Sequence, residues 1–340
     1  MSEKEIINDH EYHDDDFEFA HSKDEKLIDK TYKATSYAKD VLSNFAKNKG
    51  AIVGFVIIVI FIVMAIIGPS INPHTYKSIT KGHEYLTPRI PKVEKLGIFD
   101  GTYKGNNMYT GDLENVYYWF GADDQGRDQW TRVWSGTRVS LIIALAAVLV
   151  DIIIGMVYGL ISGFFGGKVD MIMQRLAEIL NGVPTLVVVT LLGLVLPRGM
   201  WSIIFALILT GWIPMERIAR AQVLKVKEQE YVLASRTLGA SKFRLIFSEI
   251  LPNIFGQVIV TSMFSIPNAI FLEAYLSFLG LGVPQPMASL GSLVSDGYKC
   301  MTTFPHILVY PVVAMSVLML AFNLFADGLR DAFDPKMLNK

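Results

Sequence analysis

An uncharged apolar run, AIVGFVIIVIFIVMAIIG from Ala51 to Gly68, is the feature that most limits how this chain can fold. Its length is close to the roughly 20 residues that an α-helix needs to cross the hydrocarbon core of a bilayer. In such a core every backbone polar group must be paired within the segment, so a helix is the expected form. Fifty mostly polar residues precede the run, which argues against a cleaved signal peptide.

Five further apolar runs recur along the chain, separated by polar segments. They lie at about Val139–Phe165, Leu176–Leu196, Met200–Met215, Ile254–Leu281 and His306–Ala326. The 340 residues are 51% hydrophobic and only 19% charged, a composition more apolar than that of a soluble domain. The sequence therefore predicts an all-α membrane protein with six transmembrane helices.

Lysine and arginine residues in the short loops indicate the orientation, because cytoplasmic loops carry an excess of them. Lys168 and Arg175 lie in the second loop, whereas the third loop offers only Arg198 and the fifth only Lys299. The fourth loop is the richest, with Arg217, Arg220, Lys225, Lys227, Arg236, Lys242 and Arg244. We therefore expect the fourth loop and both termini to be cytoplasmic.

These runs and loops divide the chain into consecutive regions. We expect a cytoplasmic tail at 1–48, a first transmembrane helix at 49–70, an extracytoplasmic loop at 71–136, a five-helix core at 137–327 and a cytoplasmic tail at 328–340. The segment from Lys26 to Lys49 is amphipathic and bears lysines, so it could form an elbow helix along the inner leaflet. An insertion at His74–Tyr118, rich in tyrosine and proline, is expected to fold as an external element.

The fourth loop, at 216–252, is predicted to form a helix, a glycine turn and a second short helix. Glu228 and Glu230 stand where a helix N-terminus favours negative charge, and Gly239 would end that helix. A second helix closed by Pro252 would then carry one apolar stripe, made of Phe243, Phe247, Ile250 and Leu251. Because the residues at the bend are small, its tip could enter a groove on another protein; a solvated hairpin is the alternative.

The stretch EYVLASRTLGASKFRLIFSEILPN, from Glu230 to Asn253, resembles the cytoplasmic signature loop of ABC importer permeases. Leu233, Ala234 and Ser235 stand at that family's Glu-Ala-Ala triplet, so Leu233 replaces the glutamate, and Glu249 occupies a position that is usually apolar. The resemblance implies that this loop couples the chain to ATPases through Glu230, Ala234, Ser235, Arg236, Leu238, Gly239, Ala240 and Ser241.

Four further stretches are similar to the C-type permeases of oligopeptide and dipeptide importers. They are FGADDQGRDQWTRVWSGTRVSL (120–141), GFFGGKVDMIMQR (163–175), EAYLSFLGLGVPQP (273–286) and NLFADGLRDAFDPKM (323–337). The resemblance implies a type I ABC importer permease fold in the bacterial cell membrane and an ATP-driven alternating-access import of peptides. It also implies a homologous second permease, two cytoplasmic ATPases that hold ATP and Mg²⁺, and an extracytoplasmic peptide-binding lipoprotein.

The residues themselves favour a transporter subunit that is not an enzyme and binds no cofactor. The nearest approach to a phosphate-binding loop, SGFFGGKVD, lacks the first glycine and the hydroxyl residue after the lysine. A single cysteine, Cys300, excludes an intrachain disulfide and a multi-cysteine metal site. The net charge of −1 and the lack of a basic face argue against a nucleic-acid partner.

Ionisable groups inside the spans are candidates for the translocation path, because burying them in a membrane is costly. Asp151 lies in the middle of the second run and Glu273 near the outer end of the fifth, where water or the partner subunit could solvate it. Structural hydrogen bonding is the alternative for both. Gly155, Gly159 and Gly163 recur every four residues and predict close helix packing.

Two other functions stay open at this stage. The same family signatures occur in permeases associated with nickel complexes and sugars, so another cargo is the first alternative. An ion-coupled secondary transporter is the second, although the paired intramembrane charges and repeated halves expected of one do not stand out in the sequence.

Overall fold

The structure is a computed structural model that describes residues 37–197 and 199–333. The chain divides after Asp40 into two compact units, and every helix from α3 onward belongs to the second, Val41–Lys340. Most of the predicted tail at 1–48, with the first half of its elbow helix, lies outside the described residues, as do Arg198 and residues 334–340.

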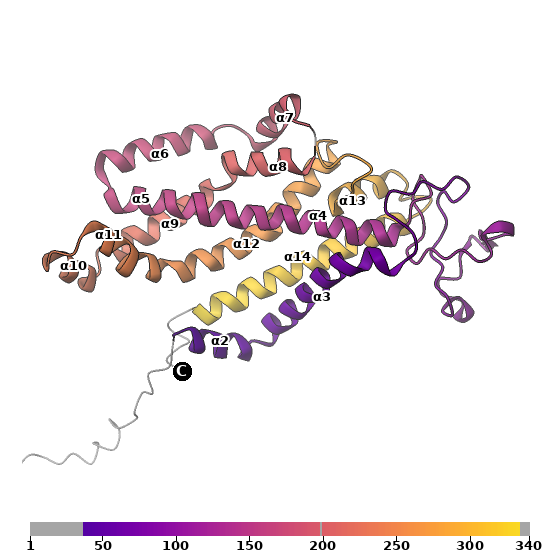
Figure 1. Ribbon diagram of the computed structural model, residues 1–340, viewed down its shortest axis with the longest axis horizontal. Coiled ribbons are helices and arrows are strands. Elements are labelled where there is room, and N and C mark those ends of the chain that lie inside the picture. Colours follow the sequence, from indigo (N-terminus) through magenta and orange to yellow (C-terminus); the bar gives the residue numbers. More distant parts are fainter. Residues whose placement is uncertain (1–36, 198, 334–340) are drawn as a thin grey trace, which may run out of the picture. The chain divides into compact units, whose positions relative to one another are not determined.

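The elements follow one another along the chain as labelled in Figure 1. The helices are α2 (Tyr37–Lys47), α3 (Lys49–Ile71), α4 (Gln129–Val150), α5 (Val157–Phe165), α6 (Gly167–Asn181), α7 (Thr185–Val195), α8 (Met200–Ala206), α9 (Ile213–Val226), α10 (Glu230–Thr237), α11 (Lys242–Arg244), α12 (Leu251–Phe278), α13 (Leu290–Lys299) and α14 (His306–Phe333). Three π-helical segments join neighbouring helices: η4 (Asp151–Met156), η5 (Leu207–Gly211) and η6 (Leu245–Ile250). The short elements are η2 (Glu94–Leu96), η3 (Gly111–Leu113), β1 (Thr102–Tyr103) and β2 (Asn106–Asn107).

The predicted all-α membrane fold is confirmed, with five or six candidate spans where six were predicted. Among the described residues five helical stretches are long and apolar enough to cross a membrane, and a sixth span is formed if the bent pair α6 and α7 counts as one. The five stretches are Lys49–Ile71, Gln129–Phe165, Met200–Val226, Lys242–Phe278 and His306–Phe333.

The third span begins at Gly167, before the predicted start at Leu176, and bends by 75° between α6 and α7. Pro184 is the N-cap of α7 and has no N–H to continue the preceding helix, which explains the position of the bend. The first turns of α6 were missed because they are polar. Asp170 lies there, and its carboxylate pairs with Arg220 of α9 at 2.6 Å instead of facing solvent.

Two predicted limits of the fourth loop are wrong. The fourth span continues as α9 to Val226, because Glu216 is fully buried and accepts a hydrogen bond from Gln174 at 2.6 Å. Pro252 does not close a helix, since residues Lys242–Phe278 form one continuous stretch. The proline is the second residue of α12, where the π-helical segment η6 gives way to a regular α-helix.

Three other boundaries differ from the sequence prediction. The long loop after α3 ends at Asp128, the N-cap of α4, whose side chain accepts a hydrogen bond from the backbone N–H of Thr131 at 2.8 Å. Helix α14 continues to Phe333, beyond the predicted end of the core at 327. Helix α2 covers the described part of the expected elbow segment.

Close packing of α5 against α9 confirms the interpretation of the glycine stripe. A Cβ atom on Gly159 would lie 2.4 Å from the backbone oxygen of Glu216, and one on Gly155 would lie 2.8 Å from the Cβ of Met215. A Cβ on Gly163 would lie 3.0 Å from the Cβ of Val223. The stripe therefore lets two backbones meet at a distance that any larger residue would prevent.

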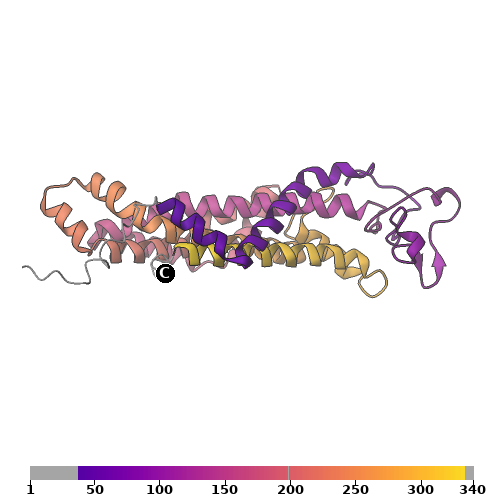
Figure 2. The same cartoon turned by 90° about the horizontal axis from the view of Figure 1, so that it is seen from below.

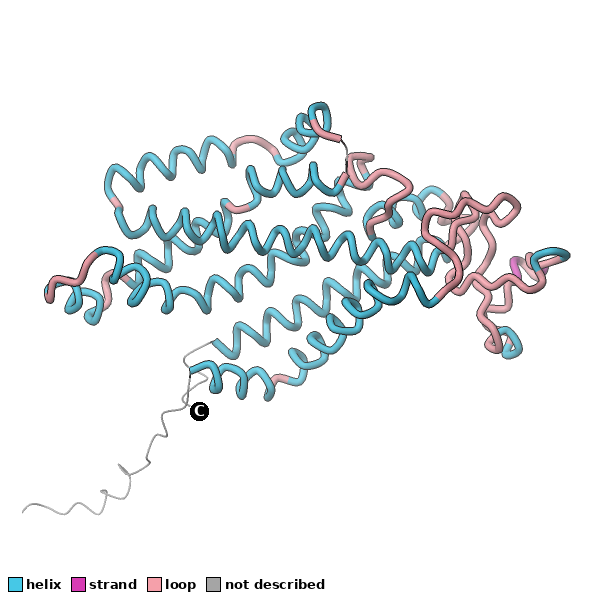
Figure 3. Tube along the Cα trace, viewed as in Figure 1, coloured by secondary structure: helices cyan, strands magenta, loops and turns pink. Residues whose placement is uncertain are grey.

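The insertion at 74–118 is folded, as its composition predicted. Tyr109 and Tyr118 are buried in a small apolar cluster with Leu86 and Ala122, and the Tyr109 hydroxyl donates to the Thr87 carbonyl at 2.7 Å. Burial raises the pKa of Tyr118 to about 12. Figure 3 shows that loops dominate this part of the chain. Figures 1 and 2 both place it at the end of the bundle opposite α10 and α11.

Candidate functional site

The predicted coupling loop is a compact hairpin. Helix α10 ends at Thr237, and Gly239 follows in the left-handed conformation with φ +83°. Ser241 then caps α11, since its hydroxyl accepts a hydrogen bond from the backbone N–H of Arg244 at 3.3 Å. The prediction of a helix, a glycine turn and a helix is therefore confirmed, and the second helix runs on into a membrane span.

Side-chain contacts hold the two arms of the hairpin together. The hydroxyl of Ser235 donates to the carboxylate of Glu249 at 3.4 Å, and Val232 and Leu245 are buried. Burial, with a smaller contribution from the nearby charge of Glu249, raises the pKa of Tyr231. Glu249, which departs from the family pattern, thus has a structural partner at the triplet position Ser235.

The tip of the hairpin exposes large apolar side chains. Leu238 is 88% exposed, Phe243 70% and Phe247 49%, and the two phenylalanine rings lie 4.3 Å apart. Of the predicted apolar stripe, both phenylalanines are therefore exposed, whereas Ile250 is buried. Because η6 is π-helical, the spacing of a regular α-helix does not hold across it.

The base of the hairpin is braced against the helices beside it. Lys227 donates to the carbonyl of Gly163 at 2.9 Å, and the ammonium group of Lys242 lies 5.6 Å from the centre of the Phe165 ring. Arg220 of α9 makes two hydrogen bonds to Asp170 of α6, at 2.7 and 2.6 Å. The base of the hairpin is therefore tied to α5, and α9, which leads into it, is tied to α6.

Among the other predicted site residues, Glu230, Arg236 and Ala234 lie exposed on α10, while Ser235 and Ala240 are partly buried. The structure thus brings all the predicted coupling residues to one hairpin. The coupling role of these residues stays a prediction.

Asp151, the first candidate for the translocation path, lies at the start of η4 and is 4% exposed. Ser265 of α12 hydrogen-bonds its carboxyl group, whereas one oxygen, Oδ2, has no hydrogen-bond partner. This half-satisfied acid sits between two spans of the chain. Its contact with cargo stays a prediction.

Glu273, the second candidate, is fully buried. Its carboxylate accepts hydrogen bonds from the hydroxyls of Ser277 at 2.6 Å and Ser140 at 3.2 Å, and a further one from Ser289. Serines of the same chain therefore solvate it, in place of the water or partner subunit expected from the sequence. Ser265, the neighbour of Asp151, precedes Glu273 by eight residues, about 12 Å along α12, so the two acids do not form one site.

Sequence reasoning missed a cluster of buried charges near the start of α4. Arg127 and Arg132 are each 1% exposed, and both pair with the carboxylate of Asp123. Arg132 also lies 3.5 Å from Asp296 of α13. The signal was present in GADDQGRDQWTR, where three aspartates and two arginines gather in a few residues.

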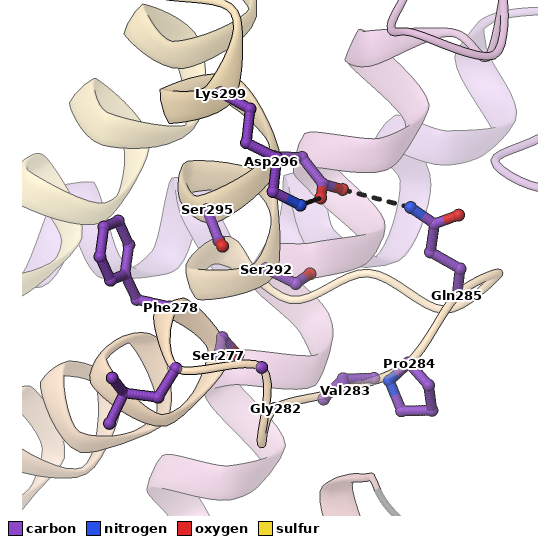
Figure 4. A pocket seen from close by; sticks show the side chains of 12 residues that line it. Ser277, Phe278, Gly282, Val283, Pro284, Gln285, Ser292, Ser295, Asp296 and Lys299 are labelled. Carbon is purple, nitrogen blue, oxygen red and sulfur yellow. Dashed lines mark hydrogen bonds and ion pairs between the residues drawn. The ribbon is translucent and has the colours of Figure 1, made fainter.

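Asp296 also borders a polar pocket of about 450 Å³ between the end of α12, the following loop and α13. Figure 4 shows Gln285 and Lys299 turned toward Asp296, with Ser292 and Ser295 on the same helix. Gln285 donates to Asp296 at 3.5 Å and Lys299 at 3.4 Å. The pocket thus adjoins the ion pairs that fix the long loop to α13.

A bundle of apolar spans with an exposed, glycine-turned hairpin at one end defines a membrane permease subunit. A family model described as "Binding-protein-dependent transport system inner membrane component" matches residues 155–339, more than half of the chain. A second, "N-terminal TM domain of oligopeptide transport permease C", matches residues 36–88. The chain belongs to the family of binding-protein-dependent inner-membrane permeases, in its oligopeptide and dipeptide C-type branch.

Curated relatives agree over nearly the whole chain. The chain is 44% identical to the oligopeptide transport system permease protein OppC of Bacillus subtilis (strain 168). The match extends over 305 residues, which are 90% of this chain and 92% of that protein. It is 43% identical over 335 residues to the dipeptide transport system permease protein DppC of Lactococcus lactis subsp. cremoris (strain MG1363), covering 94% and 97%.

Among solved structures, a similar chain occurs in an inward-facing crystal form of the MetNI methionine ABC transporter. The TM-score is 0.46 at 15% identity, covering 57% of this chain and 94% of the other.

Proposed function

We propose that this permease imports peptides, driven by ATP hydrolysis on separate subunits. The observation that carries the proposal is the braced hairpin: its tip presents Leu238 and Phe243 to the outside, while its base is fixed to spanning helices. The 44% identity to an oligopeptide permease supports the choice of cargo. A nickel complex or a sugar is the alternative cargo.

The partners follow from this role. A homologous second permease would complete the translocation path, and two cytoplasmic ATPases holding ATP and Mg²⁺ would each receive one hairpin. An extracytoplasmic lipoprotein would deliver the peptide. Because α10 and the span that begins at Lys242 are joined by a short glycine turn, closure of the ATPases would move η6 and α12 with the hairpin. This chain would bind no nucleotide itself.

The function predicts ATP-dependent uptake of peptide by proteoliposomes that contain the chain and its co-expressed partner subunits. A radiolabelled tripeptide is presented with the binding protein on the outside of the vesicles. It should accumulate inside only when ATP is present in the lumen, where it reaches the ATPase subunits. Omission of this chain should abolish uptake. Uptake of nickel or of a sugar without any competition by peptide would support the alternative cargo and would exclude the proposed one.

The proposed orientation places the hairpin in the cytoplasm and the folded segment 72–128 outside. In a Cys300→Ser background, Ser241→Cys should therefore resist a membrane-impermeant maleimide in intact cells and react after permeabilisation, because Ser241 is exposed at the tip. As a matched control, Ser78→Cys, in the exposed external loop, should react in intact cells. Labelling with the opposite pattern would reverse the topology.

A further inference from the structure

A groove of about 370 Å³ opens on the surface of the bundle between α3 and α4, with α12 and α14 at its floor. Its rim consists of aliphatic side chains that are exposed in the structure, Ile62, Ile66, Ile142 and Leu145. The groove has a single charged lining residue, Arg138 of α4. An apolar groove with one cation is the feature to be explained.

Arg138 is held in place by the backbone of α3. Pro69 has no N–H, so the carbonyl of Ala65, four residues earlier, lacks its usual helical donor. The Nε of Arg138 donates to that carbonyl at 2.8 Å, and its Nη2 donates to the carbonyl of Ile66 at 3.0 Å. The guanidinium group is therefore fixed at the edge of the groove.

The positive charge of Arg138 has no counter-ion in the described part of the chain. No carboxylate of residues 37–197 or 199–333 lies within 4.0 Å of its guanidinium group, although the other arginines of α4 and its N-terminal loop are paired. Of five N–H groups, two are used, which leaves three to bind an anion. A fixed cation beside an apolar surface calls for an external negative charge.

Tryptophans mark the depth of this site in the bilayer. Trp130 and Trp134 precede Arg138 by two turns and one turn of α4, and Trp130 donates to the carbonyl of Gly68 at 2.9 Å. Tryptophan favours the headgroup region of a membrane. Arg138 lies about 6 Å deeper along α4 than Trp134. Its side chain is long enough to reach a lipid phosphate from that depth. From there the groove runs toward the middle of the spans, past Ile62 and Leu145.

We propose that this groove binds an anionic phospholipid, with its phosphate on Arg138 and one acyl chain along Ile62, Ile142 and Leu145. A phosphate is recognised well by the planar donor fork of arginine. A zwitterionic headgroup would bring a cation of its own, and none of the described residues that line the groove is acidic. The bound lipid would neutralise Arg138 and fill the seam between α3 and α4.

Native mass spectrometry of the full-length chain, purified with its partner subunits, tests this site. Phosphatidylglycerol is expected to bind the wild type at least about tenfold more tightly than phosphatidylcholine, as a charge-assisted pair allows. Arg138→Gln should lose that preference, whereas Arg138→Lys should keep part of it. The glutamine keeps one amide N–H for the Ala65 carbonyl, and size-exclusion profiles should show that this variant folds.

The matched control is Arg175→Gln, which removes the same charge from an exposed arginine paired with Glu178 and should leave lipid preference unchanged. A photo-crosslinking amino acid at Ile62, which is 43% exposed, should yield a phospholipid adduct. An undiminished preference in Arg138→Gln, or crosslinking of position 62 to a partner subunit in place of lipid, would overturn the proposal. Neither readout depends on transport.

Discussion

Replacing Gly159 by alanine is expected to destabilise the subunit strongly, although the change adds a single methyl group. That methyl would lie 2.4 Å from the backbone oxygen of Glu216 and 2.8 Å from the Cβ of Ala219. Neither contact can be relieved by turning a side chain, and α9 cannot move away without loosening the pair of Arg220 with Asp170. Overpacking of this kind lowers the free energy of unfolding by about 1–3 kcal/mol, and a leucine at position 159 should lower it further.

The measurement is the amount of monodisperse subunit extracted from membranes and its melting temperature in detergent. We expect both to fall for Gly159→Ala, and Gly159→Leu should not accumulate. Gly182→Ala is the matched control, because its Cβ would meet the nearest atoms at 3.4 Å, an ordinary contact. If the two alanine variants behaved alike, close approach of α5 and α9 would not be what the glycine stripe provides.

Gly239→Val is expected to abolish peptide uptake while leaving the subunit folded in the membrane. Gly239 has φ +83°, a conformation that a β-branched residue resists, and no atom of the described residues 37–197 and 199–333 lies within 4 Å of its added Cβ, its chain neighbours aside. Valine would therefore distort the turn and enlarge its tip without a clash inside the subunit. Uptake should fall at least about tenfold, the equivalent of about 1.4 kcal/mol of lost docking.

Gly105→Val provides the matched control. Gly105 has φ +84° and an equally open surrounding. It lies in the turn between β1 and β2, in the folded loop at the end of the bundle opposite the hairpin. The Gly105→Val variant should have similar backbone strain at its turn, but peptide uptake should change little. Copurification of the ATPases reports docking directly, and it should decline for Gly239→Val alone. Normal uptake and normal copurification of the Gly239→Val complex would favour the solvated hairpin, without a mechanical role.

Patterns that depend on local chemistry could be predicted from the sequence. The apolar runs specify spans because an unpaired backbone is excluded from hydrocarbon, and the glycine spacing specifies a packing face. Gly239 specifies the turn because glycine alone adopts its conformation readily. The coupling residues were found together for the same reason: they are close in sequence, so a short hairpin brings them to one place.

Features that depend on distant partners could not be predicted in this way. The polar first turns of α6 and the last turns of α9 were assigned to loops, because the pairing of Asp170 with Arg220 spans fifty positions. Phe243 and Phe247 were assigned to one stripe with Ile250 by an α-helical period, but η6 interrupts that period and both phenylalanines are exposed. The charged residues that pair with Arg132 can be seen in the sequence, but the sequence does not show that they are buried together.

By itself, the sequence determined the helical membrane fold and the position of the glycine-turned hairpin, because hydropathy, glycine and proline act through the local backbone, and its motifs determined the family. Only the tertiary structure decided how buried charges are solvated. Three serines, from α4, α12 and the N-cap of α13, surround Glu273. The Ala65 carbonyl, freed by Pro69, and the carbonyl of Ile66 position Arg138. The energy of a buried polar group depends on its partners in space, and their positions are fixed only when the helices pack.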